Sequence, residues 1–293
     1  MANSFKYTFV NSDISWEIGL HHHSLSFSAD GKTLAVAKAH QSSTEYGGIR
    51  FLDVNSGASR GSQNLWEMAV FSPTQSDTVL LKFGRKEAMI MKQDPPGATS
   101  WKESPSRVIG DQGTFRLDGM RITSIKINND VGEWDSSLAS TIETNSITFP
   151  PNSTKASSVT YSPDNLLLIG FETGQLTIRD YESINTLIQL APVGFKKISA
   201  CAWSANGQWI ATGDDDGDTR LWNASNRIKI ALVKLIPRNN LSPILSLIFV
   251  PDSTALIILG GDYLRVWDIG KGAFVDNGAG LLPAGYGKKH HFR

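Results

Sequence analysis

Short segments in which apolar and polar residues alternate run along most of the chain and predict β-strands. Two of them are ISACAW at residues 198–203 and TRLWN at residues 219–223. In TRLWN, Arg220 and Leu221 lie on opposite faces of the strand because successive side chains alternate. The segment DDDGD at residues 214–218 supplies the Asp-Gly pair of a tight hairpin turn. The pattern predicts an all-β chain of short antiparallel strands joined by tight turns.

One strand-turn-strand unit recurs along the sequence. Each copy begins with a strand that ends in an aromatic residue, followed by Ser, by Pro or Ala, and by Asp or Asn. An apolar strand, a polar turn and a third strand come next. The plainest copies are LSFSADGKTLAVA, VTYSPDNLLLIGFETGQLTIRD and CAWSANGQWIATGDDDGDTRLWN, at residues 25–37, 159–180 and 201–223, and weaker copies occupy residues 69–91 and 247–268. Self-similarity of this kind indicates a repeat architecture.

The aromatic residue that ends the first strand of each copy sets the repeat period. The successive separations are 44, 90, 42 and 46 residues, counted along Phe27, Phe71, Tyr161, Trp203 and Phe249. The double step predicts one further unit, whose segment has enough alternation for four strands but lacks the recurring turn residues. We therefore predict six units, the third strongly diverged. A period in the forties with four short strands suits a propeller blade, which buries its faces against its neighbours.

The motifs FSADG, YSPDN, WSANG, LWN and VWD resemble the WD-repeat family over residues 20–270. The resemblance implies a β-propeller of four-stranded antiparallel blades. Six repeats are detectable and seven blades are usual in the family, so six and seven blades both stay open. The alternating segment FKYTFV at residues 5–10 and the segment AFVDN from Ala273 compete as the strand that completes the last blade.

The resemblance also implies a hydrogen-bonded network within the plainest repeat. In the family this network joins a turn aspartate, a strand hydroxyl, the tryptophan of the third strand and a histidine that precedes the repeat. Asp216, Thr212 and Trp222 match the first three, and Trp267 is the tryptophan of the last repeat, but Phe195 stands at the histidine position. We expect the network to be incomplete and packing to contribute more.

The repeats assign residues 1–276 to one propeller domain. Residues 277–293 are Gly-rich and end in KKHHFR, which predicts a flexible C-terminal tail. Residues 92–114 are polar and interrupted by Pro and Gly, so we predict that they form a protruding loop that carries Trp101.

Charge and composition restrict the classes of partner. The chain has 28 Lys and Arg against 28 Asp and Glu, so no net field attracts nucleic acid or an anionic membrane. No apolar run of about 18 residues and no signal-peptide pattern is present. The single cysteine, Cys201, excludes internal disulfides and is expected to be a small buried thiol. We expect a cytoplasmic or nuclear protein whose partners are other proteins or peptides.

Candidate chemical motifs lack their structural context. GASRG at residues 57–61 matches the G-x-S-x-G pattern of hydrolases, but it follows a strand and reads as a polar turn. The acidic run at residues 214–218 does not have the spacing of a calcium loop. His21 and His23 share one strand face but lack a third metal ligand of known position. We expect no cofactor, no metal and no enzymatic activity; a catalytic propeller would use His21, His23 and Asp216 first.

Exposed Trp and Arg are typical anchors of protein interfaces. The candidate interaction surface comprises Trp66, Trp101, Trp134, Arg50, Arg220, Arg265, His21 and His23. The alternative for each tryptophan is partial burial against a neighbouring blade. The three arginines hold equivalent positions in three repeats and form either a basic ring or separate solvated residues. The function that the resemblance implies is a protein-interaction scaffold; the alternative is a ligand- or effector-sensing module of a larger signalling protein.

Overall fold

A computed structural model describes the chain from His22 to Val275 with gaps. The described residues are 22–38, 48–64, 68–83, 87–93, 101–110, 112–126, 128–136, 143–149, 154–180, 186–190, 196–227, 229–237, 241–261 and 263–275. They contain no helix that is long and apolar enough to cross a membrane.

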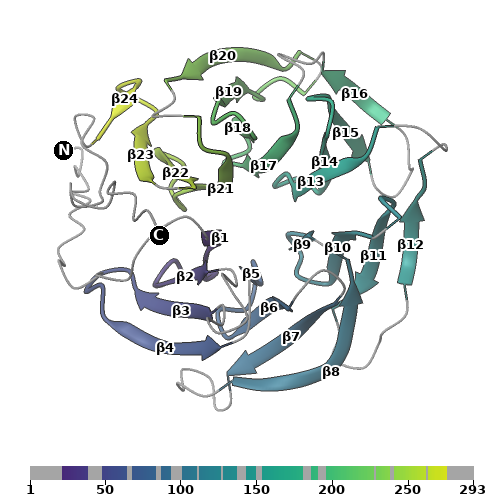
Figure 1. The fold of residues 1–293 in the computed structure, drawn as a ribbon, viewed down its shortest axis with the longest axis vertical. Helices are drawn as coiled ribbons and strands as arrows, with labels where there is room; N and C mark the ends of the chain where they lie inside the picture. Colours follow the sequence, from purple (N-terminus) through teal and green to yellow (C-terminus); the bar gives the residue numbers. More distant parts are fainter. Residues whose placement is uncertain are drawn as a thin grey trace, which may run out of the picture.

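Six four-stranded sheets stand around a central channel as the blades of a ring (Figure 1). Neighbouring strands within each sheet are antiparallel. The predicted all-β propeller of four-stranded blades is therefore confirmed, and the number of blades is six.

The strands follow one another outward from the channel in every blade. The first three blades contain β1 (His22–Phe27), β2 (Thr33–Lys38), β3 (Gly48–Asp53) and β4 (Ser59–Asn64); β5 (Met68–Phe71), β6 (Thr78–Phe83), β7 (Glu87–Gln93) and β8 (Trp101–Ile109); and β9 (Gln112–Phe115), β10 (Arg121–Ile125), β11 (Val131–Asp135) and β12 (Glu143–Ile147). The last three contain β13 (Ala156–Tyr161), β14 (Leu166–Phe171), β15 (Leu176–Asp180) and β16 (Thr186–Leu190); β17 (Ile198–Trp203), β18 (Trp209–Asp214), β19 (Thr219–Asn223) and β20 (Ala231–Ile236); and β21 (Ile244–Phe249), β22 (Ala255–Gly260), β23 (Leu264–Asp268) and β24 (Ala273–Phe274).

The core of the molecule lies between the blades. Each of the six interfaces between adjacent blades holds a hydrophobic cluster. Phe51 and Phe71 meet between the first and second blades, and Leu25 and Val266 meet where the last blade packs against the first. The middle strands of a blade are therefore covered on both faces, and each blade depends on its neighbours for its core.

Serine hydroxyls of the inner strands join one blade to the next. The Ser26 Oγ accepts a hydrogen bond from the Phe71 N–H (2.9 Å), and the Ser199 Oγ donates to the Ile244 carbonyl (2.6 Å). The Leu25 N–H donates to the Ser246 Oγ (3.2 Å), which closes the ring between the last blade and the first. Similar bonds join Ser24 to Ala69 and Ser157 to Ile198.

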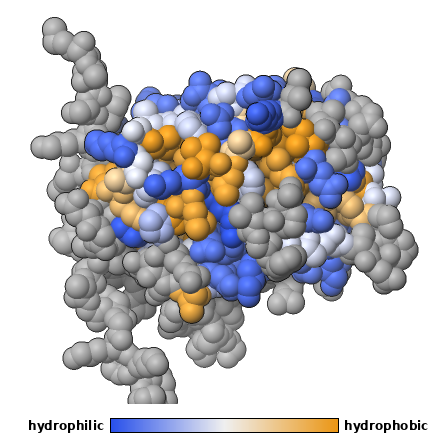
Figure 2. Space-filling model, turned by 90° about the horizontal axis from the view of Figure 1, so that it is seen from above, coloured by the Kyte–Doolittle hydropathy of each residue, from blue (hydrophilic) through white to orange (hydrophobic). Residues whose placement is uncertain are grey.

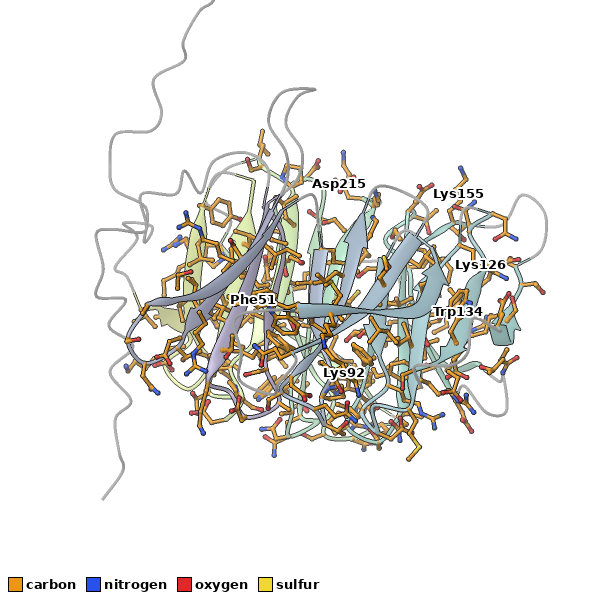
Figure 3. All side chains as sticks on the ribbon, turned by 90° about the horizontal axis from the view of Figure 1, so that it is seen from below. Phe51, Lys92, Lys126, Trp134, Lys155 and Asp215 are labelled. Atoms are coloured by element: carbon orange, nitrogen blue, oxygen red, sulfur yellow. The ribbon has the colours of Figure 1, made fainter. Side chains whose placement is uncertain are left out.

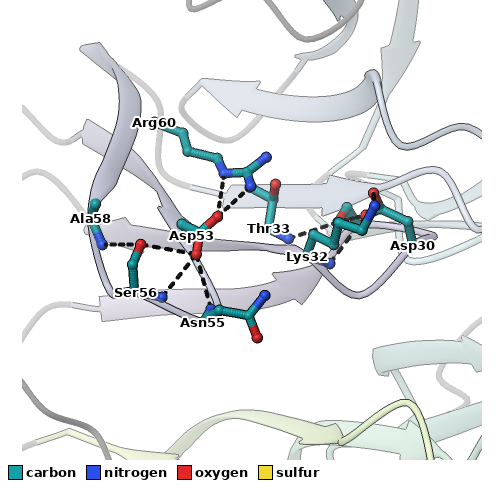
Figure 4. Close-up of polar contacts among 9 residues, drawn as sticks. Asp30, Lys32, Thr33, Asp53, Asn55, Ser56, Ala58 and Arg60 are labelled. Carbon is teal, nitrogen blue, oxygen red and sulfur yellow. Dashed lines mark hydrogen bonds and ion pairs between the residues drawn. The ribbon is translucent and has the colours of Figure 1, made fainter.

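The recurring Ser and Asp or Asn after the first strand form a hydrogen-bonded turn. In the first blade the Ser28 Oγ donates to Asp30 (2.6 Å) and accepts from the Thr33 N–H (2.9 Å), a turn drawn in part in Figure 4. In the fifth blade Ser204 bonds in the same way to Asn206 (2.7 Å) and to the Trp209 N–H (2.9 Å). The hydroxyl bridges the turn, which explains why these residue types recur.

The hydrolase-like segment at residues 57–61 runs from the end of the polar turn after β3 into the beginning of β4. Asp53 accepts hydrogen bonds from the backbone N–H groups of Asn55 (3.0 Å) and Ser56 (2.8 Å) and forms an ion pair with Arg60 (Figure 4). These contacts hold the pKa of Asp53 below its ordinary value, and the hydrogen bond from Arg60 contributes most. No helix follows this segment, so it does not form a nucleophile elbow; its interpretation as a turn was only partly right, because residues 59–61 belong to β4.

The third blade carries the recurring turn after all. Phe115 ends β9 and divides the 90-residue step into 44 and 46 residues. The segment FRLDG that follows has the same form as FSADG, and Gly119 has a positive φ of 71° where Gly31 has 68°. Arg116 stands in place of the serine, and its Nε donates to Asp118 (2.7 Å). The prediction that this unit lacks the turn residues was wrong, because an arginine substitutes for the hydroxyl.

The prediction that residues 92–114 form a protruding loop was also wrong. This segment contains the outermost strand of the second blade, β8, and the beginning of β9. Trp101 starts β8 and is 9% exposed, with its ring stacked on Phe51 at 4.6 Å between centroids. An edge strand tolerates polar residues and Pro105, because its outer side needs no ladder hydrogen bonds.

The last blade is completed by β24, so AFVDN from Ala273 supplies its outer strand. Phe274 lies edge-on against Trp267, at 5.0 Å between centroids, and the Arg265 guanidinium lies 3.2 Å from the Phe274 ring centroid. The competing segment at residues 5–10 and the predicted tail at residues 277–293 lie outside the described residues.

Candidate binding channel and repeat network

A cavity of about 660 Å³ occupies the centre of the ring and is lined by all six inner strands. Half-buried Val70, Thr114, Thr160 and Ile248 form much of its wall. Larger half-buried side chains, Phe27 and Met68, also line it. The open volume lies within the range of ligand pockets. The described lining of the channel contains hydroxyls, apolar groups, one thiol and two lysines but no carboxylate.

The two mouths of the channel differ in chemistry. Pro73, Leu117 and Pro251, from the turns that follow the inner strands, line one mouth. Lys82 and Lys197 lie at the mouth where the inner strands begin. Asp215 and Lys155 project from one face of the ring in Figure 3. The Asp215 N–H donates to the Lys197 carbonyl (3.2 Å), so the lysine mouth opens on that face.

Cys201 lines the channel wall. Burial raises the pKa of its thiol to about 12, so the thiol stays protonated at neutral pH. A protonated thiol is a poor nucleophile and metal ligand. Within the described residues, no group of three or more His, Cys, Asp or Glu side chains is placed to hold a metal ion.

None of the candidate surface residues whose side chains the structure describes is fully exposed. Trp101 and Trp134 are 9% and 2% exposed, and Arg220 and Arg265 are both 6% exposed. Burial therefore excludes these four from an exposed anchor surface. For Trp101 and Trp134 the alternative, burial against a neighbouring blade, holds, and the interpretation of Arg220 and Arg265 as solvated or ring-forming residues was wrong. The reason is that the middle strands of a blade, and the inner face of its outer strand, are covered by a neighbouring blade.

The remaining candidates are half-buried or lie outside the description. Arg50 lies on β3 and is half-buried, and burial lowers its pKa. Trp66 and His21 lie outside the described residues, and His23 lies on β1 with its side chain outside them. No basic ring forms, since Arg220 and Arg265 each have contacts within their own blade.

Arg220 forms a buried ion pair in the fifth blade. Its Nη1 lies 2.7 Å from Asp214 Oδ2, and its Nη2 lies 3.5 Å from Asp218. The Asp214 side chain is 1% exposed, and its Oδ1 accepts the N–H groups of Asp216 (3.1 Å) and Asp218 (2.9 Å). Asp214 thus ties the hairpin turn to the strand that carries Arg220.

The predicted repeat network is present in part. The Trp222 Nε1 donates to the Thr212 Oγ1 at 3.1 Å, with both residues buried. Asp216 is half-exposed and pairs with Lys196 (3.1 Å), so it does not reach Thr212 or Trp222. Phe195 lies outside the described residues. The buried contacts of the turn come from the neighbouring Asp214.

Trp134 is the tryptophan of the third blade, which the sequence analysis did not assign to the repeat. It lies opposite Ile122 on β10, as Trp222 lies opposite Ile210 on β18. Its separation from Phe115 is 19 residues, the same as that between Trp203 and Trp222. The aromatic-to-Trp spacing was therefore a usable signal. The same register holds Leu52, Met91, Arg179 and Trp267 in the other blades.

A buried carboxylate distinguishes the third blade. Glu133 is 5% exposed, and in the other five blades its position is apolar, held by Phe51, Ile90, Ile178, Leu221 and Val266. One carboxylate oxygen contacts the Thr144 hydroxyl at 3.5 Å, and the other has no hydrogen-bond partner. Burial raises the pKa of Glu133 against the opposing charges of Arg116 and Arg121.

We expect Glu133→Leu to raise the free energy of unfolding at pH 7 by about 1–3 kcal/mol, because it replaces a poorly satisfied buried charge with an apolar side chain. The native state binds a proton at Glu133 more readily than the unfolded chain does. The stability of the wild type should therefore fall as pH rises from the ordinary glutamate value through the raised pKa. Denaturant unfolding at several pH values measures both effects.

The exposed Glu143 provides the control for this prediction. Its carboxylate pairs with Lys126 at 2.7 Å near the surface, so Glu143→Leu should change stability by less than about 1 kcal/mol. Lower stability of Glu133→Leu at neutral pH would contradict the prediction and make the carboxylate a required partner of Arg116.

Comparison with known proteins agrees with this geometry. Residues 191–223 match the family model of the WD domain, G-beta repeat. Over 92 residues the chain is 32% identical to apoptotic protease-activating factor 1 of Homo sapiens, a match that spans 29% of this chain but 7% of that protein. The chain thus covers a small part of that relative.

Two solved structures share the fold. The β-propeller domain of Cps50 (Swd1) from Myceliophteria thermophila superposes with a TM-score of 0.66 at 13% identity, covering 87% of this chain and 84% of that one. Sqt1 from Chaetomium thermophilum, in a structure bound to the N-terminus of the ribosomal protein L10, superposes with a TM-score of 0.61 at 16% identity, covering 87% and 86%. At these identities the similarity establishes the fold.

Proposed function

Because the chain is a WD-repeat β-propeller, we propose that it is a non-enzymatic scaffold whose central channel receives a peptide segment of a partner protein. The channel carries this proposal: it offers about 660 Å³ between the six inner strands. Proline and leucine side chains at one mouth and lysines at the other give an extended segment two chemically different ends to contact.

Two further observations support a peptide as the partner. The ring is joined by hydrogen bonds between buried inner strands, so the channel is pre-formed and binding costs little ordering of the protein. A propeller of the same fold, Sqt1, has been solved bound to the N-terminus of a ribosomal protein. A chain terminus or an extended loop is the kind of partner segment that fits a channel of this size.

Filling the channel tests the proposal. Thr160 is half-buried on the channel wall, and Thr160→Phe would obstruct the lumen. Affinity purification of the full chain from its native source, quantified by mass spectrometry, should then lose at least one directly cross-linked partner by about ten-fold, a loss of about 1.4 kcal/mol in binding.

The matched control is Ser62→Phe, which adds the same side chain to an exposed position on β4. This variant should keep the partners of the wild type. If the wild type and a folded Thr160→Phe variant retain the same partners, the proposal that the channel binds a partner segment is wrong.

The second candidate is a recognition module of a larger signalling protein. The match to a 7% portion of apoptotic protease-activating factor 1 favours it. Sequencing the transcript tests it. A reading frame that continues beyond the present chain supports this candidate. An in-frame stop codon before Met1 together with a stop codon directly after Arg293 contradicts it.

A further inference from the structure

The central channel is a closed passage that runs the full height of the inner strands. Hydrogen bonds between blades close the ring, including the one from the Leu25 N–H to the Ser246 Oγ (3.2 Å). The rim on the side of β20 is a continuous surface of packed side chains (Figure 2). A partner segment therefore reaches the channel through its mouths. One is the lysine mouth, and the other, lined by Pro73, Leu117 and Pro251, we call the proline mouth.

The volume of the channel suits one extended chain. By the usual spacings of strands and sheets, one extended residue occupies about 160 Å³. A cavity of about 660 Å³ therefore holds about four residues of a single chain. A loop would have to place two arms side by side through one mouth, and each arm would reach about half as deep. The volume thus favours a chain end over a loop as the occupant.

The charged groups of the channel lining are all positive. Lys82 and Lys197 line the lysine mouth, and no carboxylate is present in the described lining. The two lysines belong to the second and fifth blades, which stand opposite each other in the ring (Figure 1). Lys197 is exposed and forms no ion pair with another described residue, whereas the adjacent Lys196 pairs with Asp216 at 3.1 Å. An anionic group at this mouth therefore meets positive charge from two sides.

We infer that the channel receives the carboxyl-terminal segment of the partner protein, inserted from the proline mouth, with its terminal carboxylate between Lys82 and Lys197. The inference rests on the proposed function of the channel and adds which end of the partner binds. A terminal carboxylate reaches two opposite charges at the lysine mouth. A terminal ammonium would meet like charges there and find no carboxylate along the described lining.

The direction of insertion follows from the cost of moving a charge away from water. A carboxylate that passed the lysines first would travel on to Pro73, Leu117 and Pro251, where the described lining holds no cation. A charge without a partner is costly in such a place. Insertion from the proline mouth instead leaves the carboxylate at the lysines, so the rest of the partner lies on the proline side of the ring.

Peptide binding to the full chain tests the inference. Random synthetic hexapeptides are screened in two libraries, one with a free carboxyl terminus and one with a terminal carboxamide. A peptide selected from the free-acid library should lose about ten-fold in affinity when the same sequence is amidated, because a charge-assisted contact is lost. Fluorescence anisotropy measures the affinities, with the label at the amino terminus. A folded domain fused to the carboxyl end of the peptide should abolish binding, and the same domain at the amino end should not.

Lysine variants locate the carboxylate. Lys197→Met should weaken the free-acid peptide by about five-fold and the amide by less than about two-fold, and adding Lys82→Met should bring the loss for the acid to about ten-fold. Lys197→Arg keeps the charge and should retain most of the affinity. The matched control is Lys229→Met, since Lys229 is exposed on the same blade outside the channel lining. This variant should bind both peptides as the wild type does.

The results separate this inference from the proposed function. If acid and amide bind equally, or if Lys197→Met weakens both equally, while Thr160→Phe abolishes binding, then the channel binds peptides and the carboxyl-terminal inference is wrong. If neither library yields a binding peptide, or if binding survives Thr160→Phe unchanged, the channel is not the peptide site, and the proposed function fails together with the inference.

Discussion

Replacing Trp101 with alanine is expected to lower the free energy of unfolding by about 3–5 kcal/mol, the usual loss for a buried tryptophan. Trp101 is 9% exposed, stacks on Phe51 at 4.6 Å and lies 6.3 Å from Phe71, between ring centroids. These rings belong to one cluster that holds the first blade against the second. Urea unfolding followed by circular dichroism measures the change.

The adjacent residue provides the control for Trp101. Lys102 lies on the same strand and is exposed, so Lys102→Ala should change stability by no more than about 0.5 kcal/mol. Trp101→Phe keeps an aromatic ring against Phe51 and should lose less than the alanine variant. A loss below about 1 kcal/mol for Trp101→Ala would mean that this segment behaves as the protruding loop that its polarity suggests.

The repeated part of the fold was predictable because a blade is a local unit. The aromatic residue, the turn and the next two strands lie within about 20 residues, so the pattern and the contacts coincide. The Trp222–Thr212 hydrogen bond is one such local contact, and it was expected from the resemblance to the WD-repeat family. The outer strand of the last blade was harder to predict, because two segments competed for that place. One of them lies outside the described residues.

Polar outer strands were not predictable from periodicity. β8 reads WKESPSRVI, in which the apolar residues stand at the two ends and the middle is polar. An outermost strand pairs on one edge and packs on one face, so few of its positions need to be apolar. The rule for recognising a strand by alternating hydrophobicity therefore fails for strands of this kind, and the segment resembles a loop.

The alternation of apolar and polar residues correctly predicted which face of the strand carries each arginine. It did not predict that a neighbouring blade buries that face. Arg220 and Leu221 do lie on opposite faces of β19, yet both are buried. The sequence pattern describes one strand, whereas burial of the second face depends on the next blade. Glu133 and Arg116 similarly concealed the third repeat, because polar residues at core and turn positions removed the expected pattern.

Replacing Asp214 with alanine is expected to destabilise the protein by about 3–5 kcal/mol, because it leaves a buried guanidinium without its main partner. Arg220 is 6% exposed, and its remaining carboxylate, on Asp218, lies 3.5 Å away. Two backbone N–H groups of the turn lose their acceptor at the same time. Thermal and urea unfolding, compared with the wild type, measure the loss.

Two further variants separate the charge from the turn. Asp214→Leu combined with Arg220→Leu removes both charges, so this double variant should recover more than half of the loss, whereas Asp214→Leu alone should not. Asp216→Ala removes a half-exposed ion pair with Lys196 and should cost less than about 1 kcal/mol. If Asp216→Ala instead costs as much as Asp214→Ala, the aspartate at the family position holds the turn, and the Asp214–Arg220 pair is secondary to it.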